Sequence, residues 1–218
     1  IYRQCQQALR EGVELSESTL GDVVGGTHHL LRPLMAALQR YVFAARKLHA
    51  DDTPINVLAP GNGKTKQGRL WVYTRDDRPA GDTTAPAVWF NYSPDRKGIH
   101  PQTHLKDYQG ILQADAYPGY NSIFETGRVI EAACWAHARR KFYDIHETGP
   151  TPITTYVLRK IGELYQIESG IRGSPPERRR EVRQELAKPI VEALHLWLKE
   201  QLSTVSRKSL SADAIGYA

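Results

Sequence analysis

The sequence predicts an α/β protein built around a mixed β-sheet, with a helical segment before the sheet and an all-helical segment after it. Apolar residues recur at helical spacing over residues 1–45 and again beyond Pro150. Between these segments, short runs rich in β-branched and aromatic residues alternate with turn residues. A chain of 218 residues holds one full domain with an appendage. We therefore divide it into 1–45, 46–147 and 148–218.

Residues 1–45 are predicted to be helical. Ser16 is a candidate N-cap, and apolar residues between Leu20 and Leu38 recur at helical spacing. Gly25 and Gly26 are expected to break this stretch into two pieces. Short helices joined by a glycine turn fit either a helix-turn-helix that reads DNA or simple packing elements, and both interpretations stay open.

The next segment is predicted to begin with a three-stranded antiparallel meander over 47–58, 69–75 and 87–92. Its first link, residues 60–68, is rich in glycine and lysine. A phosphate-binding loop is excluded because Leu58 stands where its first glycine is needed and because a strand follows. We expect a hairpin tip whose Lys64 and Lys66 can touch a nucleic-acid backbone.

Helices and strands alternate after the meander. The sequence predicts a short helix over 100–108, strands over 110–115 and 129–135, and a helix over 136–146. This order predicts that parallel strands join the antiparallel ones in a single sheet. The last helix carries three basic residues on its exposed turns, Arg139, Arg140 and Lys141. His100 and His104 are expected to be solvent-exposed.

Two amphipathic helices are predicted beyond Pro150, one between Val157 and Ile171 and one between Val182 and Leu202. Pro189 is expected to kink the second helix. The two form an αα-hairpin whose loop carries Arg178, Arg179 and Arg180. This triplet fits a DNA contact and a solvated helix start equally well.

Composition excludes several classes of protein. There are 29 Lys and Arg against 24 Asp and Glu, a net charge of +5 that is compatible with a polyanionic partner. No apolar run approaches the roughly 20 residues that span a bilayer, and the first residues do not resemble a secretion signal. We expect a cytoplasmic protein without a membrane partner. Two distant cysteines make no disulfide framework, and the ends of the chain suggest a piece of a longer protein.

Two aspartates are the candidate catalytic residues. Asp51 lies in the first strand and Asp115 ends the fourth, each directly after an alanine. Where these strands lie side by side, the carboxylates converge, and paired carboxylates hold Mg²⁺ in phosphoryl-transfer enzymes. Aspartates at strand ends also cap turns, so this alternative remains open. Asp52 is the rival of Asp51, but strand alternation points the two to opposite faces.

Cys134 and His137 form a C-x-x-H pattern at the junction of a strand and a helix. A closed zinc site needs four ligands, and no second Cys/His pair lies nearby. We therefore interpret the pair as a buried cysteine and a histidine that hydrogen-bonds locally. Patterns of triad hydrolases, zinc proteases and dinucleotide-binding proteins are absent from the sequence.

A series of linked motifs goes beyond these generic features. The motifs occur in this order: residues 48–54 (LHADDTP), 68–73 (GRLWVY), 92–96 (YSPDR), 112–117 (LQADAY) and 133–142 (ACWAHARRKF). Together they closely resemble bacterial transposases of the insertion sequence 66 family, and the resemblance covers essentially the whole chain.

The resemblance implies an RNase H-like fold with a DDE site. In that site two aspartates and a later glutamate bind two Mg²⁺ or Mn²⁺ ions, activate water to cut a transposon end, and direct its 3′-hydroxyl at target DNA. Asp51 matches the first acid and Asp115 the second, while Cys134 and His137 match a C-x-x-H to which we assign a site-supporting role. The family also implies transposon and target DNA as partners, more than one copy of the chain on DNA, and possible accessory transposon proteins.

The chain departs from the family at the third acid. No segment resembling Asp-Asn-Asn precedes a later glutamate, and Glu125, Glu131 and Glu147 come too early. The cysteine-bearing region ahead of this domain in longer members is also missing, so we expect either a shortened fragment or a truncated gene product. We expect an incomplete two-metal site that binds metal weakly and cuts DNA poorly or not at all. The alternative is a non-catalytic DNA-binding remnant of a transposase. A nuclease or resolvase outside transposition would share the fold.

Overall fold

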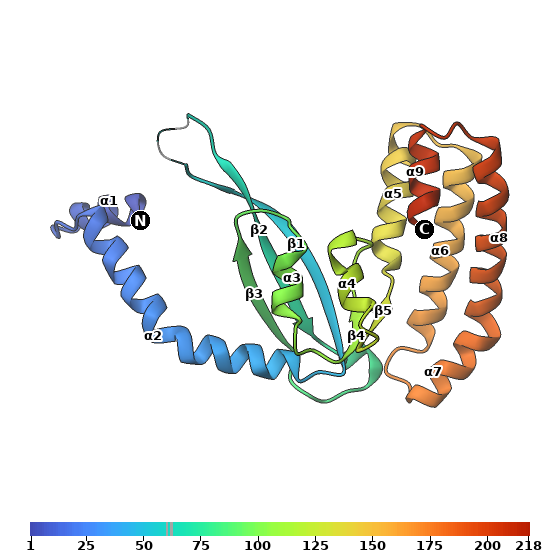
Figure 1. The fold of residues 1–218 in the computed structure, drawn as a ribbon, viewed down its shortest axis with the longest axis horizontal. Helices are drawn as coiled ribbons and strands as arrows, with labels where there is room; N and C mark the ends of the chain where they lie inside the picture. The colour runs from blue at the N-terminus through green and yellow to red at the C-terminus, as the bar shows by residue number, and fades with distance from the viewer. Residues whose placement is uncertain (60, 62) are drawn as a thin grey trace.

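The computed structural model describes residues 1–59, 61 and 63–218. The molecule is elongated, with two N-terminal helices at one end, a β-sheet in the middle and a helical bundle at the other end (Figure 1). The turn predicted over 60–68 includes residues 60 and 62, which lie outside the described residues. Among the described residues, no helix is long and apolar enough to cross a membrane.

The N-terminal segment consists of α1 (Tyr2–Arg10) and α2 (Glu17–Phe43). Ser16 caps α2, and its hydroxyl accepts a hydrogen bond from the amide of Thr19 at 3.0 Å, as predicted. The predicted break at Gly25 and Gly26 is wrong, because α2 continues through both. A glycine costs a helix interior only about 1 kcal/mol. The chain instead turns at Gly12, whose φ of 83° is accessible to glycine.

Only the end of α2 packs on the sheet. Val42 is fully buried, and Leu38 and Phe43 pack beside it. Helix α2 changes direction along its length (Figure 1), and it contains Pro33, which removes a backbone donor and bends helices. Packing on the sheet therefore stabilises only the last turns of α2. The apolar side chains of its earlier turns are exposed, among them Val23, Val24, Leu30, Leu31 and Leu34.

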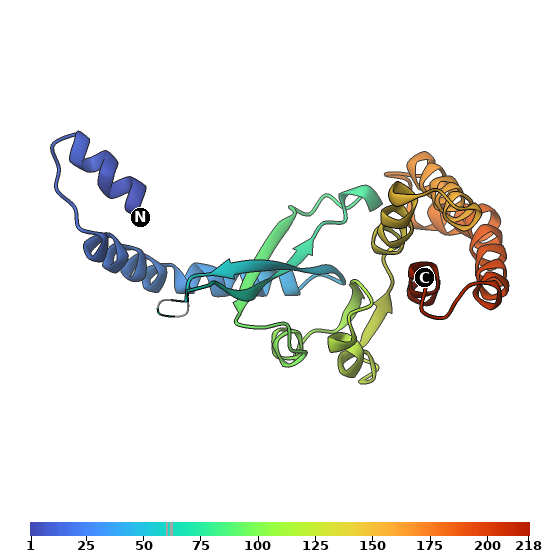
Figure 2. The same cartoon turned by 90° about the horizontal axis from the view of Figure 1, so that it is seen from above.

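The sheet has five strands in the order β3-β2-β1-β4-β5. The first three strands pair antiparallel, while β4 pairs in parallel with β1 and with β5 (Figure 2). This confirms the predicted mixed sheet. The strands are β1 (Lys47–Val57), β2 (Lys66–Arg75), β3 (Ala87–Ser93), β4 (Gly110–Gln113) and β5 (Val129–Ala132). The fourth and fifth strands end two and three residues earlier than predicted.

One face of the sheet carries the core. Helix α2, helix α3 (Ile99–His104), the 3-10 turn η2 (Pro118–Tyr120) and α4 (Asn121–Phe124) supply its covering side chains. The side chains that point into this core from β1, β2, β3 and β4 are Leu48, Ala50, Trp71, Tyr73, Trp89 and Leu112. The other face leaves apolar side chains in solvent, among them Phe90, Ile111 and Ile130.

The expectation that His104 is exposed is wrong. Its ring stacks edge-on against Tyr73 and Trp89. Its two ring nitrogens lie 3.0 Å from the Tyr73 hydroxyl and 2.8 Å from the Asn91 amide nitrogen. Burial, followed by the nearby charge of His100, lowers the pKa of His104 to about 4. The i, i+4 spacing of His100 and His104 did not predict the environment of His104, because the side chains that contact its ring lie on β2 and β3.

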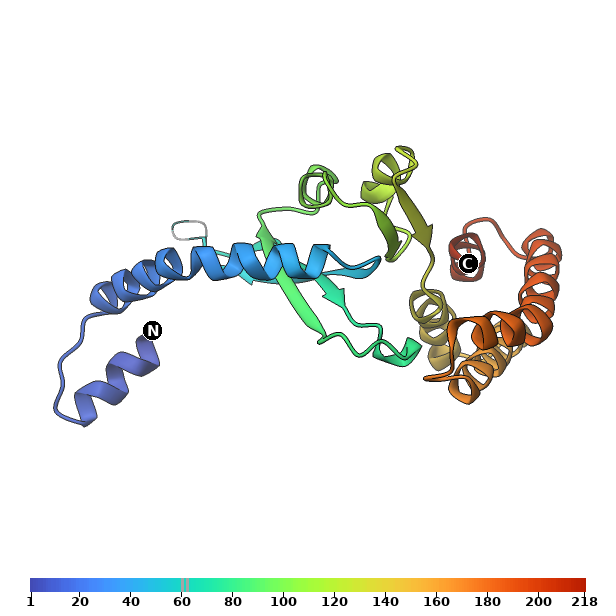
Figure 3. The ribbon, with the colours of Figure 1, turned by 90° about the horizontal axis from the view of Figure 1, so that it is seen from below.

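The C-terminal bundle contains α5 (Trp135–Thr148), α6 (Pro152–Gly170), α8 (Lys188–Thr204) and α9 (Leu210–Tyr217), as Figure 3 shows. Its buried centre includes Phe142, Ile161, Leu194 and Ile215. Helix α9 was not predicted from the sequence. The signal for it was Ser209, whose hydroxyl accepts a hydrogen bond from the amide of Ala212 at 3.1 Å.

The second helix of the predicted hairpin is longer than expected. It runs through α7 (Pro176–Val182), a π-helical turn η3 (Arg183–Ala187) and α8. The wide turn directly precedes Pro189, which cannot donate to a carbonyl and crowds an α-helical turn. The prediction that Arg178, Arg179 and Arg180 lie in the connecting loop is wrong, because all three belong to α7.

Candidate active site and nucleic-acid interface

Asp51 lies in β1, and Asp115 follows the end of β4, the parallel neighbour of β1. The ladder between β1 and β4 pairs Lys47 with Ile111 and His49 with Gln113. Each aspartate comes two residues after the last of these pairs. In a parallel ladder, corresponding residues lie at the same level along the strands. The fold therefore brings the two predicted acids to one end of the β1–β4 ladder.

Asp51 faces a small pocket on the open side of the sheet. The pocket has a volume of about 180 Å³ and is lined by Asp51, Val72, Gln113, Cys134 and His137, among others. The Asp51 side chain is 58% exposed, and its Oδ1 lies 3.8 Å from Nε2 of His137. Its carboxylate is therefore available to a ligand from solvent.

Asp52 points the other way, as strand alternation predicted. Its side chain is only 1% exposed, and its carboxylate accepts hydrogen bonds from Arg69 at 3.0 Å and from Nε of Arg96 at 2.9 Å. Both oxygens are used by these donors. A buried carboxylate with two guanidinium partners is a structural ion pair and leaves little access for a reactant.

Arg96 joins Asp52 to Asp115. One of its terminal nitrogens lies 2.8 Å from Asp52 Oδ1 and 3.0 Å from Asp115 Oδ2. The guanidinium stacks on the ring of Tyr117 at 4.2 Å, and the Tyr117 hydroxyl donates to the Arg96 carbonyl. Burial lowers the pKa of Arg96, but hydrogen bonds and charges from the two aspartates outweigh it and raise the pKa overall. Arg96 was not among the site residues predicted from the sequence.

Asp115 is held from two sides. Its Oδ2 accepts from Arg96, and its Oδ1 accepts from the backbone amide of Tyr117 at 3.3 Å. Nearby, the Tyr120 hydroxyl is buried without a hydrogen-bond partner among the described residues. Burial, and then the negative charge of Asp115, raises the pKa of Tyr120 far above its ordinary value. Tyr120 therefore stays a neutral phenol beside the carboxylates.

The side chains present do not form a complete cation site. Across residues 1–59, 61 and 63–218, no three His, Cys, Asp or Glu side chains gather closely enough to hold a metal ion. The cationic group at Asp115 is the Arg96 guanidinium. Divalent ions need about six oxygen ligands, of which carboxylates and water supply most. Asp51 and Asp115 can contribute to such a set but cannot complete it.

Cys134 and His137 lie beside Asp51. Cys134 is the N-cap of α5, and its carbonyl accepts from the backbone amide of His137 at 3.1 Å. Nδ1 of His137 is buried without a hydrogen-bond partner in the part of the chain that the structure describes. The pocket lining shared by Asp51, Cys134 and His137 places the predicted C-x-x-H next to the first predicted acid.

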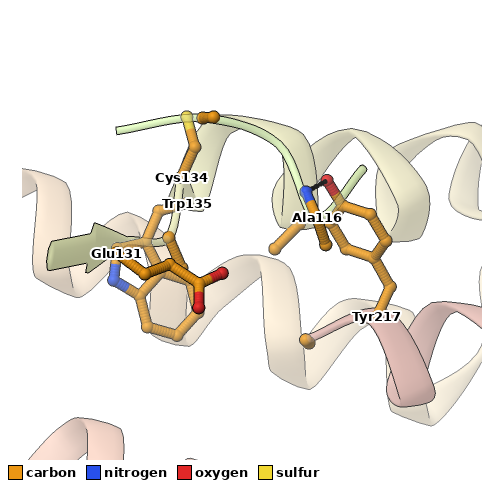
Figure 4. Close-up of a pocket in the computed structure, with 9 residues that line it drawn as sticks. Ala116, Glu131, Cys134, Trp135 and Tyr217 are labelled. Carbon is orange, nitrogen blue, oxygen red and sulfur yellow. Dashed lines mark hydrogen bonds between the residues drawn. The ribbon is translucent and has the colours of Figure 1, made fainter. Parts of the chain in front are cut away.

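The C-terminal helix returns to the second acid. The hydroxyl of Tyr217, on α9, accepts a hydrogen bond from the backbone amide of Ala116 at 3.2 Å, next to Asp115 (Figure 4). The two groups border a cavity of about 70 Å³ that Cys134, Trp135 and Glu131 also line. Burial raises the pKa of Tyr217. The contact spans 101 residues of sequence, so no local signal could have revealed it.

The predicted DNA-contacting residues occupy three separate places. Lys64 and Lys66 are exposed at the β1–β2 hairpin, which extends away from the helical bundle (Figure 1). On α5, Arg140 and Lys141 are exposed, while Arg139 stacks on Tyr143 at 5.2 Å. On α7, Arg178 and Arg180 are exposed and Arg179 is half-buried. The fold does not gather these residues into one patch.

The fold and the two aspartates define an α/β protein with a carboxylate-bearing pocket beside the parallel strands of a mixed sheet. The family model described as "Transposase IS66 family" matches residues 1–218. The chain belongs to this family, as its motifs predicted.

Three relatives from Sinorhizobium fredii (strain NBRC 101917 / NGR234) match the whole chain. "Uncharacterized protein y4hP" is 38% identical, "Uncharacterized protein y4qI" 39% and "Uncharacterized protein y4jD" 32%. The chain spans 42%, 42% and 44% of their lengths, respectively. These proteins are therefore more than twice as long as this 218-residue chain.

Proposed function

We propose that this chain is the core of a DDE-type DNA transposase with an RNase H-like fold. The observation that carries the proposal is the placement of Asp51 in β1 and of Asp115 just after β4, each two residues beyond the last pair of the β1–β4 ladder, within a chain of the IS66 transposase family. The parallel pairing of β1 with β4 supports it, because the two carboxylates were expected to converge where the first and fourth strands lie side by side. The proposed reaction is cleavage of transposon ends followed by strand transfer into target DNA.

In this proposal Asp51 and Asp115 are the first and second acids. They would hold Mg²⁺ or Mn²⁺, and such ions stabilise the attacking and leaving oxygens of a phosphodiester. The third carboxylate would come from the part of the longer proteins that these residues do not cover. His137 and Cys134 would support the site by packing beside Asp51. Asp52 and Arg96 would fix the position of Asp115.

Mn²⁺ binding to the 218-residue chain tests the assignment of the acids. Asp115→Asn and Asp51→Asn should each weaken binding, because each removes one ligand charge. Asp107→Asn is a matched control, since that side chain is 87% exposed. Equal Mn²⁺ affinity in all three variants would remove both aspartates from the proposed site.

Cleavage tests whether two carboxylates are enough. We expect little or no Mg²⁺-dependent nicking of a transposon-end duplex by this chain, because two carboxylates leave one ion without enough ligands. Robust nicking that Asp115→Asn abolishes would show that the site is sufficient as it stands. It would contradict our proposal that a third acid is required.

A DNA-binding function without catalysis is the second candidate. It is favoured by the Arg96–Asp115 ion pair, which neutralises one of the proposed acids. The function would then be DNA binding alone, through contacts between the basic residues and DNA phosphates. DNA affinity should fall steeply with salt and stay unchanged in Asp115→Asn. A nuclease or resolvase with the same fold would instead cut DNA without joining it to a target.

The proposed partners are transposon ends and target DNA. Two ends must be paired for transposition, so we propose that more than one copy assembles on DNA, with accessory transposon proteins as further partners. A cytoplasmic location, at the nucleoid when bound, follows from this function. Analytical ultracentrifugation with and without end-containing duplex would measure the assembly, and a monomer in both conditions would contradict it.

A further inference from the structure

A cleft of about 790 Å³ separates the sheet from the long helices of the bundle. Lys47 of β1, Gln113 of β4 and the first turn of α5 line one side. Helix α6, the end of α7, the π-helical turn and the start of α8 line the other. The cleft is an open groove that an extended chain of polar groups can enter.

The cleft adjoins the pocket of Asp51. Gln113 and Cys134 line both. A strand whose phosphodiester lies at Asp51 would therefore have the cleft as the continuation of its path. This connection does not depend on where the hairpin lysines or the basic residues of α5 lie.

The charge of the cleft favours an anion. Four basic side chains line it against two acidic ones: Lys47, Arg179, Arg183 and Lys188 against Glu168 and Glu192. Lys47 pairs with Asp77 at 2.5 Å, and Arg183 pairs with Glu168 through two hydrogen bonds of 2.6 Å. Lys188 lies 3.8 Å from Glu192.

Arg179 is the exception. Among the described residues it makes no ion pair, and its Nε is buried without a hydrogen-bond partner. A buried donor without an acceptor costs about 1 to 3 kcal/mol, and more for a charged group. A guanidinium offers a planar fork that matches two oxygens of a phosphate. An incoming phosphate would supply the missing acceptor.

The neighbours of Arg179 do not share this environment. Arg178 is exposed and pairs with Glu181 at 3.4 Å, and Arg180 is exposed to solvent. Successive residues of a helix point in directions about 100° apart, so only one of the three can face the cleft. The triplet in the sequence therefore contains one inward arginine and two outward ones.

We propose that this cleft binds the phosphodiester backbone of the DNA strand that enters the Asp51 pocket, and that Arg179 is its principal phosphate contact. The proposal rests on the proposed function. It adds a location and a direction for the DNA, across β1 and β4 and past α7.

Fluorescence anisotropy with a labelled DNA duplex, over a series of salt concentrations, tests the proposal. Arg179→Gln should weaken binding about tenfold and reduce the salt dependence by about one released counterion. Arg180→Gln, on the same helix, is the matched control and should change affinity by less than about threefold. Arg179→Lys keeps the charge but loses the fork, so we expect an intermediate loss.

A second pair of variants avoids any effect of Arg179 on folding. Gln184→Glu adds a negative charge inside the cleft, and Gln109→Glu adds the same charge on an exposed loop. Only Gln184→Glu should weaken DNA binding markedly. Urea unfolding of each variant checks that the fold is intact.

The outcomes separate the two proposals. If the chain binds DNA and the cleft variants behave like their controls, the cleft proposal is wrong and the proposed function stands. If the unmodified chain binds no DNA at any salt concentration, both are wrong.

Discussion

Asp51 and Asp52 are adjacent in sequence and lie on opposite faces of β1. Asp51 is 58% exposed and faces His137, while Asp52 is 1% exposed and faces Arg69 and Arg96. Alternation along a strand imposes this difference. One carboxylate is thereby available for ligands and the other for holding the structure together.

Replacing these two residues should affect stability very differently. Asp52→Ala removes the carboxylate partner of Arg69 and leaves Arg96 with Asp115 alone, and we expect a loss of about 2 to 4 kcal/mol of unfolding free energy. Partial exposure of Arg96, 38%, reduces the penalty below that of a fully buried pair. Asp51→Ala should change stability by no more than about 0.5 kcal/mol. Urea unfolding measures both, and equal losses would show that Asp52 has no structural role.

Removing the Arg96 guanidinium should make Asp115 available to a cation. Arg96→Gln should raise Mn²⁺ affinity at least about threefold, because a positive charge 3.0 Å from the carboxylate is lost. Arg69→Gln is the matched control, since Arg69 contacts Asp52 and makes no ion pair with Asp115 in the described chain. Electron paramagnetic resonance of free Mn²⁺ gives the affinity. An unchanged value in Arg96→Gln would show that the arginine does not compete with metal.

Acid should destabilise the protein through His104. Its pKa is about 4 in the folded state, because of burial, and near 6.5 in an unfolded chain. Between these values the unfolded state binds more protons, so stability falls as pH decreases from about 6.5 to 4. His104→Gln should flatten this part of the curve of unfolding free energy against pH. A curve of the same slope for both proteins would assign the acid sensitivity to other groups.

Gly110 should not tolerate a side chain. Gly110 begins β4, and its φ is 147°. An added Cβ would lie 2.5 Å from the carbonyl oxygen of Arg46. We expect Gly110→Ala to cost about 1 to 3 kcal/mol of unfolding free energy. Gly162→Ala, inside α6 with nothing within 4 Å, should instead add about 0.5 to 1 kcal/mol. Thermal unfolding should give a lower melting temperature for Gly110→Ala and a higher one for Gly162→Ala than for the unmodified protein. An unchanged melting temperature in Gly110→Ala would contradict this account.

Local patterns predicted much of the fold. The meander, the later strands and the two long helices came from periodicity and turn residues, because each depends on residues close together in the chain. Errors arose where distant partners overrule local preference. His104 is half-buried by side chains of two strands. The error at Gly25 and Gly26 has a local cause, since glycine costs a helix interior only about 1 kcal/mol and the helix continues through both. The fourth strand also ends before Asp115, which turns toward Arg96.

The sequence by itself determined the family, the order of the five strands along the chain, and the opposite orientation of Asp51 and Asp52. These follow from motifs and from a period of two residues, which any strand obeys. Tertiary structure decided which groups surround the acids. Arg96 reaches Asp52 across 44 residues, and Tyr217 reaches Ala116 across 101. Tertiary structure also decided that Arg179 lines the cleft while Arg180 stays in solvent, since helical position alone does not say which face meets a neighbour.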